Sequence, residues 1–200
     1  MTEASAVLQE RSDFAVIAEI IQPGSRVLDL GCGSGELLEW LIHNKGVLAR
    51  GVEISRAKAR QAITRGVSVY QGDIEESLAD YPDHAFDYVI LSQTLQETAR
   101  PLQVLREMLR VGKRAIVSFP NFGHWSMRLS MLFSGQAPRT RLFPYEWYES
   151  PNIHFLSVRD FERLAARYGF RVERRLFLAG RTRLTFLPNL RSQVAVFLLG

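Results

Sequence analysis

The sequence predicts an α/β protein with a mostly parallel sheet, helices on both faces and an antiparallel pair of strands near the C-terminus. Three observations predict this class. Short apolar runs alternate with segments of helical periodicity between residues 25 and 120, as in parallel sheets covered on both faces. A glycine-rich turn follows the first apolar run, and the chain closes with one helical segment and two further apolar runs.

Size and composition fit one domain spanning residues 1–200. Hydrophobic residues make up 46% and charged residues 23%, as in ordinary globular proteins. The beginning of the chain carries acids and no long apolar run, so we expect no signal peptide. No run approaches the ~18–20 apolar residues of a membrane helix, and the single Cys32 fits a reducing compartment. These features predict a cytoplasmic protein without membrane association.

The elements follow in order along the chain. A helix is expected over residues 7–22, before the first strand, which "SRVLDL" predicts at 25–30. Gly46 ends the next helix, and Ser55 is a plausible N-cap of the one after it. The remaining strands of the alternating part are expected at 47–54, 67–70, 86–92 and 113–120, and its remaining helices at 35–46, 55–66 and 100–112.

The helix at 100–112 has the clearest pattern. Pro101 lies in its first turn and Gly112 at its end. One face carries Leu102, Leu105, Met108 and Leu109.

The end of the chain breaks the alternation. "SVRDFERLAARYG" predicts a helix at 157–169, with Ser157 and Asp160 spaced as a capping box. Two strands, at 170–180 and 192–200, follow with a loop between them and should pair antiparallel. Residues 121–156 form a long segment rich in aromatic residues, and a loop of this length inside a domain is usually functional or disordered. Its aromatic content argues against disorder.

The glycine turn lies in "VLDLGCGSGELLEWL", residues 27–41. An apolar strand, a glycine turn and a helix form a nucleotide-binding arrangement, because the backbone can approach the ligand and the helix N-terminus offers free N–H groups. Gly31, Gly33 and Gly35 do not have the G-x-G-x-x-G spacing, since Glu36 stands at its last position. No G-K-[ST] follows, which excludes a P-loop.

Three acids sharpen the choice of ligand. Asp29 precedes the turn, while Glu53 and Asp73 end the next two strands. Since ligands of open parallel sheets bind beyond the carboxyl ends of the strands, these acids should face one crevice. Three carboxylates disfavour a diphosphate and suit a ligand with an ammonium, a sulfonium and ribose hydroxyls, such as S-adenosylmethionine.

On these residues the chain resembles the class I S-adenosylmethionine-dependent methyltransferases, whose glycine motif "VLDLGCGSG" matches closely. The resemblance implies a Rossmann-like fold, with Asp29 near the methionine amine, Glu53 on the ribose hydroxyls and Asp73 on the adenine amine. "LSQTLQ" would form the wall after the fourth strand. The implied residues binding S-adenosylmethionine or S-adenosylhomocysteine are Asp29, Gly31, Cys32, Gly33, Gly35, Glu53, Ile54, Asp73, Ile74, Ser92 and Gln93. Plain structural roles stay open, above all packing for Cys32 and turn formation for Asp73.

A closer resemblance covers nearly the whole chain after residue 10. "NFGHW" (121–125), "PYEWYESPNIH" (144–154) and "RDF" (159–161) are similar to the methionine biosynthesis protein MetW family, although Ser150 stands where that family usually has Thr. Membership implies a role in methionine biosynthesis and association with homoserine O-acetyltransferase. Two functions remain: a non-catalytic partner or regulator of that enzyme that binds S-adenosylmethionine, or an active methyltransferase on an unknown acceptor.

Candidate groups for catalysis lie in the aromatic segment. His124, Tyr145, Tyr148 and His154 could bind or deprotonate an acceptor, but structural roles or a partner surface explain them at least as well. "SQTLQ" lacks the N-P-P-Y pattern of enzymes that methylate base or glutamine nitrogens. No metal-ligand spacing is present, so no metal is expected. The net charge of +4 is modest, and the C-terminal arginines do not define one basic stripe, which makes nucleic acid an improbable partner.

Overall fold

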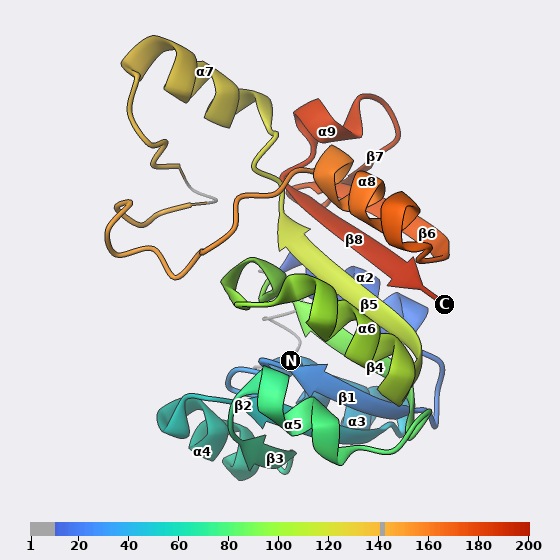
Figure 1. Cartoon of the computed structure of the whole chain (residues 1–200). Coiled ribbons are helices and arrows are strands. Elements are labelled where there is room, and N and C mark those ends of the chain that lie inside the picture. The colour runs from blue at the N-terminus through green and yellow to red at the C-terminus, as the bar shows by residue number, and fades with distance from the viewer. Residues whose placement is uncertain (1–10, 141–142) are drawn as a thin grey trace.

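A computed structural model describes residues 11–140 and 143–200. These residues form a sheet of eight strands in the order β3-β2-β1-β4-β5-β8-β6-β7 (Figure 1). The strands are β1 (Arg26–Leu30), β2 (Leu48–Glu53), β3 (Ser68–Gln71), β4 (Phe86–Ser92), β5 (Gly112–Pro120), β6 (Val172–Ala179), β7 (Thr182–Leu184) and β8 (Val194–Leu199). The strands β1 to β5 run parallel, while β8 pairs antiparallel with both β5 and β6. The predicted α/β class and its C-terminal antiparallel pair are confirmed.

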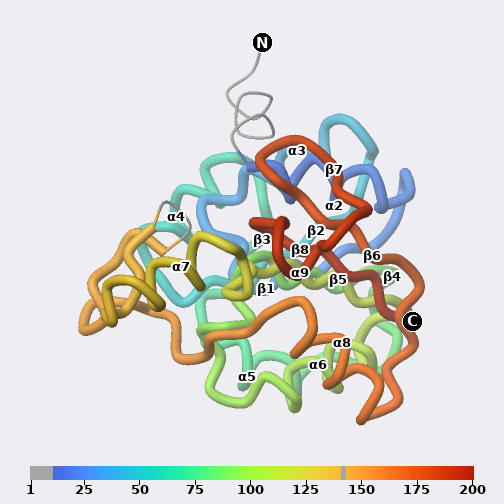
Figure 2. Tube along the Cα trace, turned by 90° about the horizontal axis from the view of Figure 1, so that it is seen from above, coloured from blue at the N-terminus to red at the C-terminus, as the bar shows by residue number. Residues whose placement is uncertain are grey.

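Helices cover both faces of the sheet. Figure 2 shows α2, α3 and α4 on one side and α5, α6 and α8 on the other. Their bounds are α2 (Ser12–Ile20), α3 (Glu36–Lys45), α4 (Arg56–Thr64), α5 (Ile74–Ser77), α6 (Pro101–Val111) and α8 (Val158–Tyr168). Every helix expected in the alternating part lies within two residues of its predicted bounds. Residues 7–10 of the helix expected at 7–22 lie outside the described residues.

The pleat of the strands explains why their sequences are apolar at successive positions and do not alternate between apolar and polar residues. Successive side chains of a strand point to opposite faces, so a sheet covered on both faces needs apolar residues at every position. In β1, Val27 packs into the core below α2 and α3, while Leu28 packs into the core below α6 and α8. Ile90 and Val89 of the neighbouring β4 divide between the same two cores.

Two parts of the chain differ from expectation. The segment 121–156 is not simply a long loop, because α7 (Trp125–Ser134) forms within it and extends beyond the end of β5 (Figure 1). The connection between β6 and β8 holds the short strand β7 and the helical turn α9 (Pro188–Arg191). Neither contributes much to the core, because α7 buries only Met127 and no residue of α9 is buried.

The helices α8 and α4 both have a serine at the N-cap, but only one of the two serines makes a capping hydrogen bond. Ser157 and Asp160 form the predicted capping box at the start of α8, with Ser157 Oγ accepting from Asp160 N at 3.3 Å and Asp160 Oδ2 accepting from Ser157 N at 3.0 Å. Ser55 occupies the N-cap position of α4, but its side chain makes no capping hydrogen bond.

We therefore expect Ser157→Ala to lower the free energy of unfolding by about 1 kcal/mol, because it leaves a helix N–H without its acceptor. Urea unfolding followed by circular dichroism measures this change. Ser55→Ala is the control and should change the value by a few tenths of a kcal/mol at most. Equal losses in the two variants would contradict the capping assignment.

Candidate functional site

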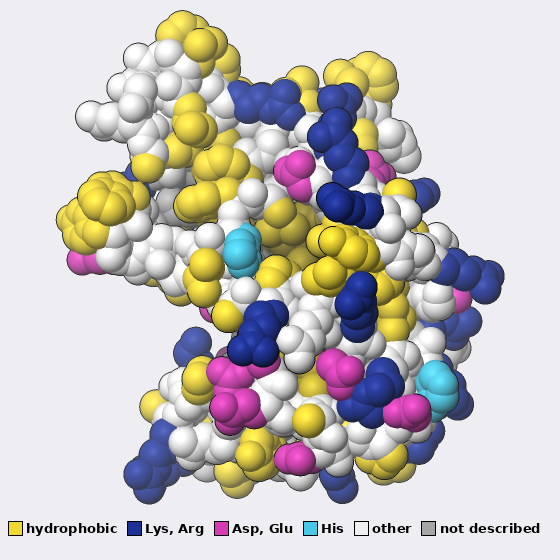
Figure 3. All heavy atoms as spheres, in the orientation of Figure 1, with side chains coloured by type: hydrophobic (Ala, Val, Ile, Leu, Met, Phe, Trp, Pro, Cys, Tyr) yellow, Lys and Arg dark blue, Asp and Glu magenta, His cyan; other side chains and the backbone are white. Residues whose placement is uncertain are grey.

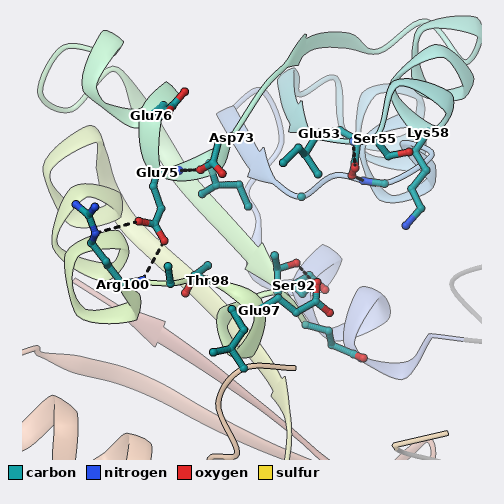
Figure 4. Close-up of a pocket in the computed structure, with 18 of the residues that line it drawn as sticks. Glu53, Ser55, Lys58, Asp73, Glu75, Glu76, Ser92, Glu97, Thr98 and Arg100 are labelled. Atoms are coloured by element: carbon teal, nitrogen blue, oxygen red, sulfur yellow. Dashed lines mark hydrogen bonds and ion pairs between the residues drawn. The ribbon is translucent and has the colours of Figure 1, made fainter. Parts of the chain in front are cut away.

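A cavity of about 730 Å³ lies where the carboxyl ends of β1, β2 and β4 meet. This is the place where ligands of open parallel sheets bind. Its lining consists of Arg11, Gly31, Gly33, Glu53, Ile54, Ser55, Lys58, Asp73, Ile74, Glu75, Glu76, Ser92, Gln93, Thr94, Glu97, Thr98, Ala99, Arg100, Gln103 and Ile153. Figure 4 shows Glu53 with Ser55 on one side of the cavity and Asp73 with Glu75 on another.

The glycine turn gives the cavity a wall of bare backbone. Gly31 and Gly33 have φ angles of 74° and 59°, a region that favours glycine. A Cβ on Gly31 would come within 2.9 Å of Thr94 Oγ1. The turn is fixed because Gly31 N donates to Val52 O at 2.8 Å. The backbone of the turn after β1 therefore lines the cavity without a covering side chain.

Glu53 joins the turn to the next helix. The side chain is buried, with 6% exposed, and each carboxylate oxygen accepts one backbone N–H: Oε2 from Gly33 at 2.9 Å and Oε1 from Ser55 at 2.8 Å. A carboxylate oxygen accepts more than one hydrogen bond. Glu53 therefore keeps acceptor capacity toward the cavity while holding two of its walls.

Asp29 stands two residues before Gly31, which lines the cavity, and it is buried and incompletely paired. Its side chain is 3% exposed, and Oδ1 has no hydrogen-bond partner among the described residues. Burial raises the pKa of Asp29 to about 8, with further raising by the charges of Asp13 and Glu53 and lowering by Arg11. At neutral pH Asp29 is therefore mostly protonated, and its unpaired buried oxygen is an acceptor whose free-energy cost a hydrogen-bond donor would relieve.

The opposite end of the cavity has an apolar face and an acid. Ile54 is 68% exposed although it is apolar, and Ile74 lines the cavity across from it. Asp73 caps α5, with Oδ1 accepting from Glu75 N at 2.7 Å. The structural role left open for Asp73 is therefore present, and its carboxylate still lines the cavity.

Eight of the eleven expected cofactor residues line the cavity: Gly31, Gly33, Glu53, Ile54, Asp73, Ile74, Ser92 and Gln93. The other three lie outside the lining. Cys32 packs in the core below α2 and α3, and burial raises the pKa of its thiol. A Cβ on Gly35 would come within 2.8 Å of Ala62 Cβ, so Gly35 allows α3 and α4 to pack closely. Asp29 is the third, in the buried position described above.

Sequence reasoning missed one group of residues beside Ser92. Arg11 and Asp13, at the start of α2, form an ion pair at 2.8 Å, and Arg11 lines the cavity. Ser92 Oγ donates to Asp13 Oδ2 at 2.7 Å and accepts from Arg11 Nη2 at 2.8 Å. The sequence signal that could have found this group is the acidic Asp13 within the apolar pattern of the first helix. In the structure the Asp13 side chain is 1% exposed.

The chain matches the family model described as "Methionine biosynthesis protein MetW" over residues 11–199. The chain belongs to the MetW family. A "Bifunctional methionine biosynthesis protein MetXA/MetW" from Rhodopirellula baltica is 35% identical over 174 residues, which are 82% of this MetW chain and 28% of the relative. The chain therefore spans less than a third of that relative's length.

Solved structures place the MetW fold among the S-adenosylmethionine-dependent methyltransferases. One from Archaeoglobus fulgidus has a TM-score of 0.71 at 17% identity and covers 98% of this chain and 94% of its own. The [4+2]-cyclase SpnF has a TM-score of 0.63 at 21% identity, over 84% of this chain and 60% of its own. These likenesses show the fold, and the cyclase illustrates that the fold alone does not determine the reaction.

The expected catalytic candidates of this MetW chain do not line the cavity. His124 is the N-cap of α7, its Nδ1 accepting from Ser126 N at 3.3 Å, and burial lowers its pKa. Tyr145 and Tyr148 are 51% and 66% exposed. His154 Nε2 is buried without a partner among the described residues, while its neighbour Ile153 reaches the cavity.

The segment 125–155 presents an aromatic surface. We use this name for its exposed apolar side chains, which gather over α7 and the chain that follows it (Figure 3). They are Trp125, Leu129, Met131, Leu132, Phe133, Tyr145, Trp147, Tyr148, Ile153 and Phe155. Apolar side chains gathered in this way are typical of interaction sites.

In the part of the chain that the structure describes, no helix is long and apolar enough to cross a membrane. The same residues include no group of three or more His, Cys, Asp or Glu side chains placed to hold a metal ion.

Burial of Asp29 predicts a pH dependence of stability. Its pKa is about 8 in the folded chain against 3.8 for the ordinary group, so the folded state holds the extra proton between these values. The stabilising contribution is complete below pH 3.8 and is lost as pH rises through 8. Asp29→Asn removes the charge, so we expect a flatter profile from pH 5 to 8 and a gain of about 1–3 kcal/mol at pH 8.

Chemical unfolding at several pH values measures this profile. Asp83→Asn, at a carboxylate whose side chain is 70% exposed, is the control and should keep the slope of the unaltered chain. An Asp29→Asn profile that falls as steeply as that of the unaltered chain would contradict the prediction.

Proposed function

We propose that the chain binds S-adenosylmethionine or S-adenosylhomocysteine and acts in methionine biosynthesis as a partner of homoserine O-acetyltransferase. The observation that carries ligand binding is the meeting of Glu53 and the glycine turn at one cavity. The buried Asp29, whose Oδ1 has no partner among the described residues, stands two residues before this turn. The carboxylates around the cavity favour a cationic ligand with hydroxyls over a diphosphate.

The chain's residues fit each part of this ligand. Asp29 Oδ1 needs a donor, which the methionine ammonium supplies. Glu53 has acceptor capacity for ribose hydroxyls, and the exposed Ile54 offers an apolar face to adenine, with Asp73 beside it. S-adenosylmethionine supplies an activated methyl group when bound, so the protein needs only to align an acceptor and remove a proton where one must leave.

The partner role rests on two observations. The relative named MetXA/MetW pairs the two proteins in one bifunctional chain. In this chain the aromatic surface includes Phe133 and Trp147, which are 81% and 74% exposed, and exposed apolar side chains gathered together are typical of interaction sites. Aromatic residues are enriched at the centres of protein interfaces.

An active methyltransferase on an unknown acceptor is the second candidate. It is favoured by Ile153, through which the aromatic segment lines the cavity and could wall an acceptor site. Transfer of labelled methyl from S-adenosylmethionine to a small-molecule extract tests this function. Product that is lost in Glu53→Gln would support the enzyme, and absence of any labelled product would leave the partner role.

Calorimetric titration tests ligand binding. We expect Glu53→Gln to weaken binding of S-adenosylhomocysteine by about 10–100-fold, or 1–3 kcal/mol, because hydrogen bonds to a charged acceptor are lost. Glu162→Gln, at an ion pair outside the cavity, is the control and should leave affinity unchanged. No heat from the unaltered chain with either nucleoside would overturn the proposed ligand.

Mixing with purified homoserine O-acetyltransferase tests the partner role. We expect co-elution as a complex, and we expect Trp147→Ser and Phe133→Ser to weaken it by about 10-fold or more, since exposed aromatic anchors carry much of such binding energy. Leu48→Ser, at a residue 68% exposed on β2, should not weaken it. Neither co-elution nor any change in the rate of acyl transfer would refute the partner role.

A further inference from the structure

A row of positive charge lies on the outer face of α8. The helix presents Arg159, Arg163 and Arg167 at spacings of four residues, and all three are exposed. Residues four apart in a helix are neighbours on its surface, so the row extends along about 12 Å of the helix. The buried Phe161 and Ala165 occupy the opposite side. We call Arg159, Arg163 and Arg167 the arginine row.

Within the described residues, no carboxylate forms an ion pair with the arginine row. The two acids of α8 have other partners. Asp160 accepts from Ser157 N in the capping box, and this contact holds the start of the helix. Glu162 pairs with Arg175 of β6 at 3.5 Å. Like charges four residues apart repel, so the row is unfavourable for the helix by itself, and its counter-charges must come from outside the described residues.

At the end of α8, the positive charge continues onto the neighbouring helix. Arg167 and Arg106 of α6 both lie over the ring of Tyr168, with guanidinium carbons 5.7 and 5.5 Å from the ring centre. Both distances are typical of a cation–π contact. Tyr168 is 42% exposed, and Arg106 is exposed as well. Figure 3 shows Lys and Arg side chains over α8 and α6, with acidic side chains among them.

At the start of α8, the arginine row borders the aromatic surface. Gly123, two residues before α7, packs against the N-cap Ser157, because a Cβ on Gly123 would come within 2.9 Å of Ser157 Cβ. Arg128 of α7 is exposed and donates from Nε to Gly123 O at 2.7 Å. Trp125, a member of the aromatic surface, is the first residue of the same helix. Positive charge and exposed apolar side chains thus meet where α7 and α8 begin.

This combination fits a protein face better than a nucleic acid. Interfaces between proteins have an apolar centre and a polar border, and arginine is enriched in them. A guanidinium can bind a carboxylate through two parallel hydrogen bonds. A polyphosphate chain along the row would be repelled by Asp160, which is exposed, and by Glu162, whose side chain is 40% exposed. Separate carboxylates on a protein can avoid these two acids.

We propose that the arginine row is the charged border of a docking surface whose apolar part is the aromatic surface, and that the docked protein face presents carboxylates to it. The row attracts and orients that face during the encounter, whereas the apolar side chains hold the complex once it has formed. This inference rests on the proposed partner role and adds the charge of the acyltransferase face that binds.

The rate of association with purified homoserine O-acetyltransferase at two salt concentrations tests this charge. Salt shortens the range of electrostatic attraction, from about 30 Å at 0.01 M to about 3 Å at 1 M. We expect the association rate constant of the full chain to fall by about 10-fold or more between about 0.05 and about 0.5 M salt, with a smaller change in dissociation. A rate constant that does not depend on salt would overturn the inference and leave the partner role standing. No complex at either concentration would overturn both.

Paired substitutions then assign the salt dependence to the arginine row. Arg159→Gln combined with Arg163→Gln should slow association by about 5–10-fold at about 0.05 M salt and leave it unchanged at about 0.5 M. Glutamine is as good a helix former as arginine, and repulsion between the like charges is relieved, so the urea midpoint of unfolding should not fall.

Arg56→Gln combined with Arg60→Gln is the matched control. It removes the same charge at the same spacing from exposed positions of α4, on the other face of the sheet (Figure 2). The control should slow association by less than about 2-fold, because these charges lie away from the docking surface. Equal slowing in the two double variants would show an effect of net charge alone and overturn the inference.

Nucleic acid is the occupant that would reassign the row. A mixed-sequence RNA and a mixed-sequence DNA duplex are the probes, each applied at about 0.15 M salt, where non-specific contacts to phosphates are weak. We expect the chain to retain neither. Retention that disappears when Arg159 and Arg163 are both replaced by Gln would overturn the inference in favour of phosphate binding.

Discussion

The cavity depends on one carboxylate that ends a strand. One carboxylate oxygen of Glu53 accepts a hydrogen bond from Gly33 N at 2.9 Å, and the other accepts one from Ser55 N at 2.8 Å. Glu53 therefore links the turn after β1 to the start of α4. Both donors are backbone groups that lack helix or sheet partners, and a buried N–H without an acceptor is costly. The same two contacts therefore stabilise the turn and join two walls of the cavity, which explains why a charged group is kept in a buried position.

Two buried aspartates, Asp13 and Asp29, differ in the hydrogen-bond partners that the protein gives them. Asp13 is buried, yet it has Arg11, Ser92 and Ser118 as partners, and its pKa is lowered. Asp29 is equally buried, lacks a partner for Oδ1 among the described residues, and its pKa is raised. The difference is one of hydrogen bonding, not of depth. Asp13 is stabilised by partners within the protein, whereas Asp29 keeps one oxygen without a partner among the described residues.

Much of this arrangement could be predicted from sequence because it follows from local patterns. Parallel strands buried on both faces give unbroken apolar runs, and the acids at their ends must meet at one edge of the sheet. Two features escaped for physical reasons. The helix α7 buries only Met127 and leaves its other apolar side chains exposed, so packing in the core does not account for it. Arg11 reaches the cavity because α2 brings it next to Ser92 at the end of β4. Such contacts depend on tertiary packing, which spacing within one segment does not encode.

The cavity and the aromatic surface share one short element, the 3₁₀ turn η2 (Leu95–Glu97). Gln96 O accepts from Ile153 N and His154 N at 2.8 and 3.0 Å, and Gln96 Nε2 donates to Gln93 O, which belongs to the cavity lining, at 2.6 Å. A ligand that orders Gln93 therefore acts on the residue that anchors the aromatic segment. Because coupling between two binding events is reciprocal, a partner that holds this segment must affect the ligand's affinity to the same extent that the ligand affects the partner's. This argument applies equally to an acyltransferase partner and to a methyl acceptor, since both would contact the segment that Gln96 holds.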